Sequence, residues 1–201
     1  MAGRVRPLGI PGVALIEATG FSDDRGGFFE YLRAEEFLLA AGHWLAVAQV
    51  NCSVSVRGAL RGIAVTDVPP GQVKVVACLA GEVLDVAVDL RVGSPAFGAW
   101  HAERLGEARR AALCLPPGVG HAFMAIADGS TVVYLLSTSH DPALERRVHP
   151  LDPDIGIEWP SGIAPVMSAK DASAPGLRQA LEAGLLPDYS ACLMAGQQEA
   201  R

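Results

Sequence analysis

Long apolar runs are missing from this sequence of 201 residues, and none approaches the roughly 18 to 20 residues that a membrane-spanning helix needs. Arginines occur early in the chain, but Glu17, Asp23 and Asp24 soon interrupt the apolar stretch that follows them. Such a pattern is a poor secretion signal. We therefore expect a cytoplasmic protein that does not bind membranes.

Cysteine is also scarce. The four cysteines, Cys52, Cys78, Cys114 and Cys192, are widely spaced and include no CxxC pair. This spacing is typical of reduced thiols in the core or on the surface of a cytoplasmic protein.

Charged residues make up only 19% of the chain, whereas 50% of it is hydrophobic, and this composition excludes a disordered protein. The net charge of -6 argues against a general binder of nucleic acids or membrane surfaces. A local basic pocket could still hold a phosphate. We find no internal repeat or linker, so we expect one domain over residues 1–189 and a flexible tail over residues 190–201.

Short runs with strand character, separated by glycine and proline, dominate the chain. The clearest are Gln72–Leu79, Glu82–Leu90 and Thr131–Ser137. In the second run one face is entirely apolar, and the other carries the carboxylates of Asp85 and Asp89.

Helix signals are few. Ala34–Ala41 is predicted to form a short helix that ends at Gly42. Ser173 is predicted to cap a second helix, with Pro175 in its first turn. Many short strands with little helix predict an all-β sandwich or barrel.

Arg25 begins the first of four candidate clusters. Two glycines follow it, Phe21 and Phe28 flank it, and Glu30 lies beyond. Such a turn could present a guanidinium to a phosphate, with aromatic rings beside it to stack on a base. The alternative is a solvated turn that leads into a strand.

Alternating polar residues form the second cluster: Gln49, Asn51, Ser53, Ser55 and Arg57. On a strand they would share one face. A face this polar suits solvent or a wet pocket, and the sequence leaves both open.

Two smaller clusters remain. His121 lies between turn glycines and Phe123, where it could titrate near neutral pH or simply pack. Lys170 and Asp171 could act in a site or form an ordinary surface ion pair.

Taken together and in this order, the clusters resemble the family of dTDP-4-dehydrorhamnose 3,5-epimerases (dTDP, deoxythymidine diphosphate), over about Gly12 to Tyr189. The residues that carry the resemblance are Phe21, Asp23, Arg25, Gly26, Phe28 and Glu30 for F-x-D-x-R-G-x-F-x-E; Gln49, Asn51, Ser53, Ser55, Gly58, Leu60, Arg61 and Gly62 for Q-x-N-x-S-x-S-x-x-G-x-L-R-G; then Lys74, the run 85–95, His121, Tyr134, Trp159, Pro160, Ser168, Lys170 and Asp171.

The resemblance implies a cupin-type jelly-roll β-sandwich with a few short helices. It also implies a homodimer in which an N-terminal strand joins the partner's sheet, and a site for a dTDP-linked 4-keto-6-deoxyhexose. No cofactor or metal is implied, and the chain lacks the HxH motif of metal-binding cupins. The implied ligand-binding residues are Phe21, Arg25, Phe28, Glu30, Gln49, Asn51, Arg61 and Lys170.

The chain departs from the family at its catalytic base. Where the family has L-R-G-[LIM]-H-[YF]-Q, residues 60–66 read LRGIAVT, so Ala64 stands at the histidine position. The resemblance implies that this histidine removes a carbon-bound proton, paired with the aspartate represented here by Asp171. It assigns stabilisation of the enolate to Lys74 and the role of acid to Tyr134. The smaller Ala64 predicts extra room in the pocket.

Three functions remain open. The chain could still epimerise or isomerise a nucleotide-linked keto sugar, with Asp171, His121 or His140 as the substitute base. It could bind a nucleotide sugar without catalysis, or support a partner enzyme. It could also be a cupin recruited to another small molecule in a biosynthetic pathway.

Overall fold

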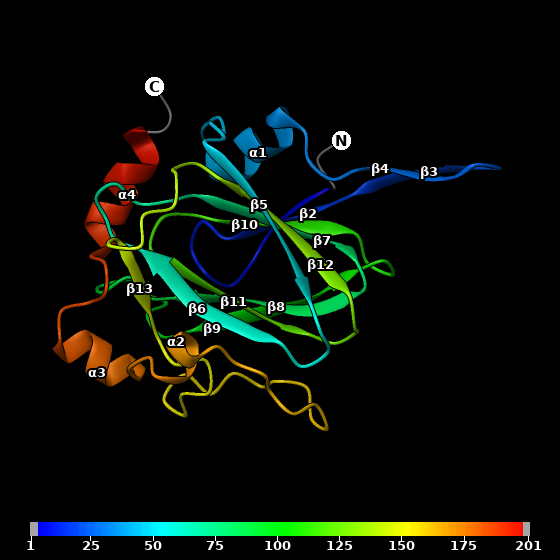
Figure 1. Cartoon of the computed structure of the whole chain (residues 1–201). Coiled ribbons are helices and arrows are strands. Elements are labelled where there is room, and N and C mark those ends of the chain that lie inside the picture. The colour runs from blue at the N-terminus through cyan, green and yellow to red at the C-terminus, as the bar shows by residue number, and fades with distance from the viewer. Residues whose placement is uncertain (1–3, 199–201) are drawn as a thin grey trace.

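In the computed structural model, which describes residues 4–198, two antiparallel sheets face each other as a sandwich (Figure 1). The six-stranded sheet has the order β1 (Val5–Pro7), β2 (Ala14–Glu17), β10 (Ala111–Leu115), β7 (Lys74–Ala80), β12 (Ser130–Leu136) and β5 (Gln49–Ser55). The five-stranded sheet has the order β13 (Glu145–Arg147), β6 (Leu60–Thr66), β11 (Val119–Ala125), β8 (Glu82–Asp89) and β9 (Trp100–Gly106). The predicted jelly-roll architecture is confirmed.

Apolar side chains from both sheets fill the space between them. Val76 and Val132 from one sheet and Ala87 and Phe123 from the other belong to one buried cluster. The predicted strands of the middle of the chain are confirmed as β7, β8 and β12.

Strand β8 is buried on both faces, not only on its apolar one. Val86 and Val88 pack in a second cluster outside the sandwich, and Asp85 and Asp89 are fully buried on the opposite face. A buried carboxylate needs a charged or hydrogen-bonding partner. Asp89 has one in Arg91, whose Nε lies 2.8 Å from its Oδ1.

Helix α1 (Ala34–Ala41) has the predicted bounds, and Gly42 ends it in the left-handed region at φ 80°. The predicted cap at Ser173 is wrong. Ser173 ends α2 (Ala169–Ala172), and α3 (Leu177–Glu182) starts after Gly176. The backbone N–H of Gly176 donates to the side chain of Gln179, and that of Leu177 donates to the carboxylate of Asp152. A partner 25 residues away in sequence therefore helps to set this start, and a local pattern does not reveal it.

The segment expected to be a flexible tail contains most of helix α4 (Tyr189–Gln198). Cys192 on this helix is buried, and the ring of Tyr189 lies 5.0 Å from the Arg91 guanidinium carbon. The chain is thus helical up to Gln198, and residues 199–201 of the expected tail lie outside the described residues. No helix within residues 4–198 is long and apolar enough to cross a membrane.

Strands β3 (Thr19–Asp23) and β4 (Gly26–Glu30) form a hairpin that extends away from the sandwich (Figure 1). Phe29 packs under the Arg110 guanidinium, with its carbon 4.1 Å from the ring centre. A Cβ atom at Gly20 or Gly27 would come within 2.7 Å of this ring. The glycines therefore let Phe29 lie flat across the hairpin.

Candidate functional site

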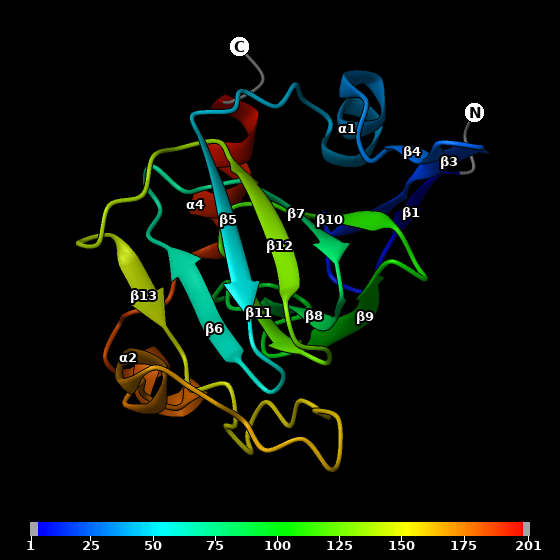
Figure 2. The same ribbon diagram turned by 45° about the vertical axis from the view of Figure 1, so that its right-hand side comes forward.

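A cavity of about 290 Å³ is lined by side chains from β5, β6, β7, β11, β12 and β13. Figure 2 shows these strands in the two facing sheets. The cavity lining joins residues from both sheets and from α2. Those residues are Asn51, Arg61, Gly62, Ala64, Gln72, Lys74, His121, Phe123, Tyr134, Leu136, His140, Glu145, Arg147, Ser168 and Asp171. The cavity thus gathers Asn51, Arg61, Lys74, His121, Tyr134 and Asp171 from the residues that the sequence singles out.

Ala64 lies at the centre of the cavity's five-stranded wall. Alternation along β6 buries Ile63 and Val65 in the cluster outside the sandwich and turns Ala64 toward the cavity. Its strand neighbours are His121 on β11 and Arg147 on β13. Both a histidine and an arginine therefore flank the position that carries no titratable group.

His121 is buried and held by a carboxylate. Its Nε2 lies 2.9 and 3.0 Å from the two carboxylate oxygens of Asp85, which is itself fully buried. If Nε2 donates its hydrogen to Asp85, Nδ1 carries the lone pair. Among the described residues no hydrogen bond reaches Nδ1. The pair has the arrangement of a histidine oriented by an acid, in which the free nitrogen can accept a proton.

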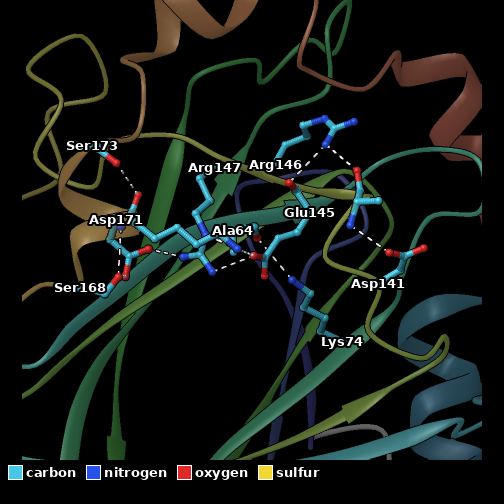
Figure 3. Close-up of polar contacts among 11 residues, drawn as sticks. Ala64, Lys74, Asp141, Glu145, Arg146, Arg147, Ser168, Asp171 and Ser173 are labelled. Atoms are coloured by element: carbon cyan, nitrogen blue, oxygen red, sulfur yellow. Dashed lines mark hydrogen bonds and ion pairs between the residues drawn. The ribbon is translucent and has the colours of Figure 1, made fainter.

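Lys74 begins β7 on the opposite wall. Its Nζ donates to the carbonyl oxygen of Ala64 at 3.3 Å, and no described carboxylate lies within ion-pair distance (Figure 3). Burial lowers the pKa of Lys74 to about 8, assisted by Arg147 and opposed by Glu145. The amine is therefore an N–H donor beside the cavity, and it loses its proton at a lower pH than an exposed lysine does.

Replacing Lys74 with methionine is expected to stabilise the unliganded protein at pH 7 by roughly 1–3 kcal/mol. Folding lowers the pKa of Lys74 from 10.5 to about 8, so the unfolded chain binds more protons between these values. Burying the charged amine of Lys74 therefore destabilises the folded protein. This destabilisation is fully present below pH 8 and disappears as the pH rises through 10.5. Urea unfolding of both proteins at pH 7 and pH 10.5 measures the difference. An equal gain at both pH values would contradict a charge-based cost.

Tyr134 reaches the cavity from β12. Its hydroxyl lies 3.2 Å from that of Ser53, and its ring meets the His121 ring edge-on with centres 5.9 Å apart. Burial raises the pKa of Tyr134, and the charge of Asp85 acts in the same direction. The phenol is therefore kept protonated and can act as a proton donor.

Asp171, at the start of α2, is enclosed by polar partners. Arg147 donates to one carboxylate oxygen, and the hydroxyl of Ser168 donates to the other at 2.8 Å (Figure 3). Arg147 also donates to Glu145 through its Nε and its second terminal nitrogen, and Lys170 forms an ion pair with Glu145. Burial raises the pKa of Glu145, but hydrogen bonds from Lys170 and Arg147 outweigh it and lower the pKa below its ordinary value.

The alternating polar face of β5 points inward and not only to solvent. Ser53 contacts Tyr134, and Ser55 accepts a hydrogen bond from Arg61 at 3.2 Å. Gln49 lies at the rim, where its amide donates to Asn51 at 2.7 Å. Of this polar face, Asn51 lines the cavity itself, and Ser53 and Ser55 bond to the lining residues Tyr134 and Arg61.

The hairpin residues lie apart from this cavity. Phe21 and Phe28 are 56% and 65% exposed and pair across the hairpin. Arg25 bonds only to neighbouring Asp23 among the described residues, and Glu30 pairs with Arg33. The structure of one chain therefore does not bring the predicted nucleotide-binding residues of the hairpin to the predicted sugar-binding residues.

Sequence reasoning missed three residues of the site: Asp85, Glu145 and Arg147. Asp85 carried a signal, because a carboxylate on a strand amid apolar residues requires a buried partner. Arg147 carried none, since its contact with Asp171 spans 24 residues. Arg147 lies next to Ala64 and lines the same cavity, and the extra room beside Ala64 stays a prediction.

Comparison with known proteins gives a consistent result. The family model described as dTDP-4-dehydrorhamnose 3,5-epimerase matches residues 7–179. A dTDP-4-dehydrorhamnose 3,5-epimerase from Streptomyces griseus is 51% identical over 189 residues, which cover 94% of this chain and 94% of the relative. A dTDP-4-dehydro-6-deoxyglucose 3-epimerase from Streptomyces bikiniensis is 48% identical over 187 residues, covering 93% and 95%.

Solved structures agree with the sequence relatives. The chain is similar to NovW, a 4-keto-6-deoxy sugar epimerase of Streptomyces spheroides, with a TM-score of 0.91, 50% identity and 94% of each chain covered. It is also similar to ChmJ, a 3'-monoepimerase of Streptomyces bikiniensis in complex with dTDP-quinovose, with a TM-score of 0.93, 47% identity, and 97% and 98% covered. On this combination of sequence, fold and site, the chain belongs to the dTDP-4-dehydrorhamnose 3,5-epimerase family.

Proposed function

We propose that this protein binds a dTDP-linked 4-keto-6-deoxyhexose in the cavity and exchanges a proton beside the ketone, with His121 as the base. The observation that carries the proposal is the His121–Asp85 pair. It lies directly across from Ala64 and borders the same cavity as Lys74 and Tyr134. The proton acceptor missing at position 64 thus has a neighbour of the same chemical type.

In the proposed reaction, Nδ1 of His121 takes the proton from the carbon beside the ketone, and the C–H electron pair moves to form an enolate. The N–H of Lys74 stabilises the negative charge on the former ketone oxygen. Tyr134 returns a proton to carbon from the opposite face, which inverts the centre, and water restores both residues. The reaction needs no redox partner, because no electrons leave the sugar.

The other candidate bases are less suited. Both carboxylate oxygens of Asp171 already accept a hydrogen bond, one from Arg147 and one from Ser168, which makes the carboxylate a weaker base. His140 is exposed, and no described carboxylate orients its ring. Of the three histidine and aspartate candidates, His121 alone combines burial with an orienting acid.

Relatives named as 3-epimerases and as 3,5-epimerases both match this chain. Family membership therefore leaves the stereocentre open, and we propose exchange at C3, C5 or both as the measurable outcome.

We further propose that a second copy of the chain completes the nucleotide part of the site. The hairpin carries exposed Phe21, Arg25 and Phe28 away from its own cavity, with the chemistry to stack on a base and hold a phosphate. In a homodimer these residues would reach the partner's cavity.

Replacing Phe28 with alanine is expected to weaken dTDP binding roughly 10-fold, because stacking of a base on an aromatic ring contributes about 1–3 kcal/mol. The melting temperature should stay unchanged, since the ring is 65% exposed. Isothermal titration calorimetry with dTDP measures the effect. Leu39→Ala is the control, because Leu39 is 70% exposed on α1 and lies outside the hairpin. Equal affinity of Phe28→Ala and the wild type would contradict a role in nucleotide binding.

The function itself is tested by proton NMR of the wild type with dTDP-4-keto-6-deoxyglucose in D₂O. Deuterium incorporation at C3 or C5 above the uncatalysed rate is the expected result. The alanine at position 64 supports one other candidate function, binding of the sugar nucleotide without turnover. Line broadening without deuterium exchange would favour this function. No interaction at all would favour the recruited-cupin alternative.

A further inference from the structure

Arg147 stands beside the vacant histidine position and has no role in the reaction described above. We propose that Arg147 replaces the absent imidazole as the fixed partner of Asp171 and donates a hydrogen bond to the bound sugar. The position of the absent histidine then recognises the ligand but cannot itself remove a proton from it. The sugar contact rests on the proposed function, whereas the partnership with Asp171 does not.

Strand register places Arg147 where it can do this. β13 is the edge strand of the five-stranded sheet, and Arg147 is directly opposite Ala64 on β6. From there the guanidinium crosses beside the small methyl group to the Asp171 carboxylate (Figure 3). A larger side chain at position 64 would compete with Arg147 for the space and for Asp171.

The surroundings hold the guanidinium in place. Glu145 accepts from its Nε at 3.2 Å and from a terminal nitrogen at 2.9 Å. The other terminal nitrogen, Nη1, donates to Asp171, whose other oxygen accepts from the Ser168 hydroxyl at 2.8 Å. Two carboxylates therefore clamp one cation, and a planar fork of N–H groups suits such a clamp better than an ammonium does.

A guanidinium has five N–H groups, and the bonds to Glu145 and Asp171 use three of them. No described residue accepts a hydrogen bond from the remaining two, and Arg147 lines the cavity. They can donate to a hydroxyl or carbonyl oxygen of a sugar. They offer no lone pair, so this side chain cannot act as a base.

Ala64 and Arg147 should therefore act as a coupled pair. A histidine introduced at position 64 would find Asp171 already bound to Arg147 and would lack its orienting acid. Removing Arg147 at the same time would release Asp171 and the space together. The gain from the two changes should exceed the product of the single effects.

The first experiment compares deuterium exchange into dTDP-4-keto-6-deoxyglucose for the wild type, Ala64→His, Arg147→Thr and the double variant. We expect Ala64→His to stay within about threefold of the wild type, and the double variant to exceed Ala64→His by about 100-fold or more, the size of a restored base. Threonine suits the strand and leaves the carboxylate accessible. Equal rates for Ala64→His and the double variant would overturn the coupling.

The second experiment tests the sugar contact by calorimetry with two probes, dTDP and dTDP-4-keto-6-deoxyglucose. Arg147→Met should weaken binding of the sugar nucleotide about 10-fold and leave the affinity for dTDP unchanged, because Arg147 lies in the sugar part of the cavity. Equal weakening for both probes, or for neither, would overturn the contact with the sugar.

The third experiment needs no ligand and therefore separates this proposal from the proposed function. Arg147→Met and Asp171→Asn should each lower the melting temperature by several degrees, and the double variant should lose less than the sum. Arg178→Met is the control, since its pair with Asp154 is 3.4 Å long with side chains 74% and 46% exposed. Additive losses would overturn the partnership of Arg147 with Asp171, even if dTDP fails to bind.

Discussion

Replacing His121 with asparagine is expected to slow deuterium exchange beside the sugar ketone by about 10²- to 10⁴-fold, the usual cost of losing a positioned base. Asparagine can still donate a hydrogen bond to Asp85, so the buried carboxylate keeps a partner. The affinity for dTDP should remain unchanged, because His121 lies in the wall beside Ala64 and not on the hairpin. NMR exchange rates and calorimetry of the same preparation separate the two effects.

Two further variants sharpen this test. Asp85→Asn should cause a loss of similar order, because an amide can bond the imidazole in the other tautomer and leave Nδ1 protonated. His140→Asn is the matched control: its ring is an exposed imidazole on the same cavity and should cost less than about threefold. If His121→Asn exchanges at the rate of the wild type, the base is another residue and the proposed mechanism is wrong.

Replacing Arg91 with methionine is expected to destabilise the fold by about 3–5 kcal/mol, because it leaves the carboxylate of Asp89 buried without its counterion. The pair is 2% and 0% exposed, with contacts of 2.8 Å to both carboxylate oxygens. Arg91 also donates to the carbonyl of Pro11 at 2.9 Å and packs on Tyr189 of α4. One side chain thus joins the end of β8, the N-terminal loop and the last helix.

Urea unfolding measures the Arg91 effect. Arg104→Met is the control, because the Arg104–Glu82 pair has the same distance of 2.8 Å but side chains that are 58% and 41% exposed. Exposed pairs contribute about 0–1 kcal/mol. Similar losses in both variants would show that burial does not set the cost of the Arg91 pair.

Binding to dTDP and stability should respond independently to these changes. The hairpin variants alter binding without altering the melting temperature, and Arg91→Met alters stability far from the candidate cavity. If the hairpin variants lowered both the affinity for dTDP and the melting temperature, the hairpin would belong to the folded core. The exposed rings of Phe21 and Phe28 argue against that.

Local chemistry explains what could be predicted. Gly42 adopts the left-handed conformation that ends α1, as the sequence pattern indicates. Strand alternation predicts β8 and the polar face of β5, because each depends on residues two positions apart. The ordered motifs indicate the family, and the order of residues along a chain is visible without any structure.

Long-range contacts explain what could not. The start of α3 depends on Asp152, and the packing of α4 depends on Arg91, so neither is visible in its own segment. The sequence places residues of the hairpin and residues of the cavity in one predicted site. Only the folded chain shows that they lie apart.

By itself, the sequence determined the all-β sandwich, the family and an alanine at position 64, because these follow from local periodicity and from motifs in order. Tertiary structure decided what surrounds Ala64. His121 meets Asp85 across 36 residues, and Arg147 meets Asp171 across 24. Which charges become partners depends on strand register and on burial, which raises the cost of any unpaired charge, and neither property belongs to a single segment of the chain.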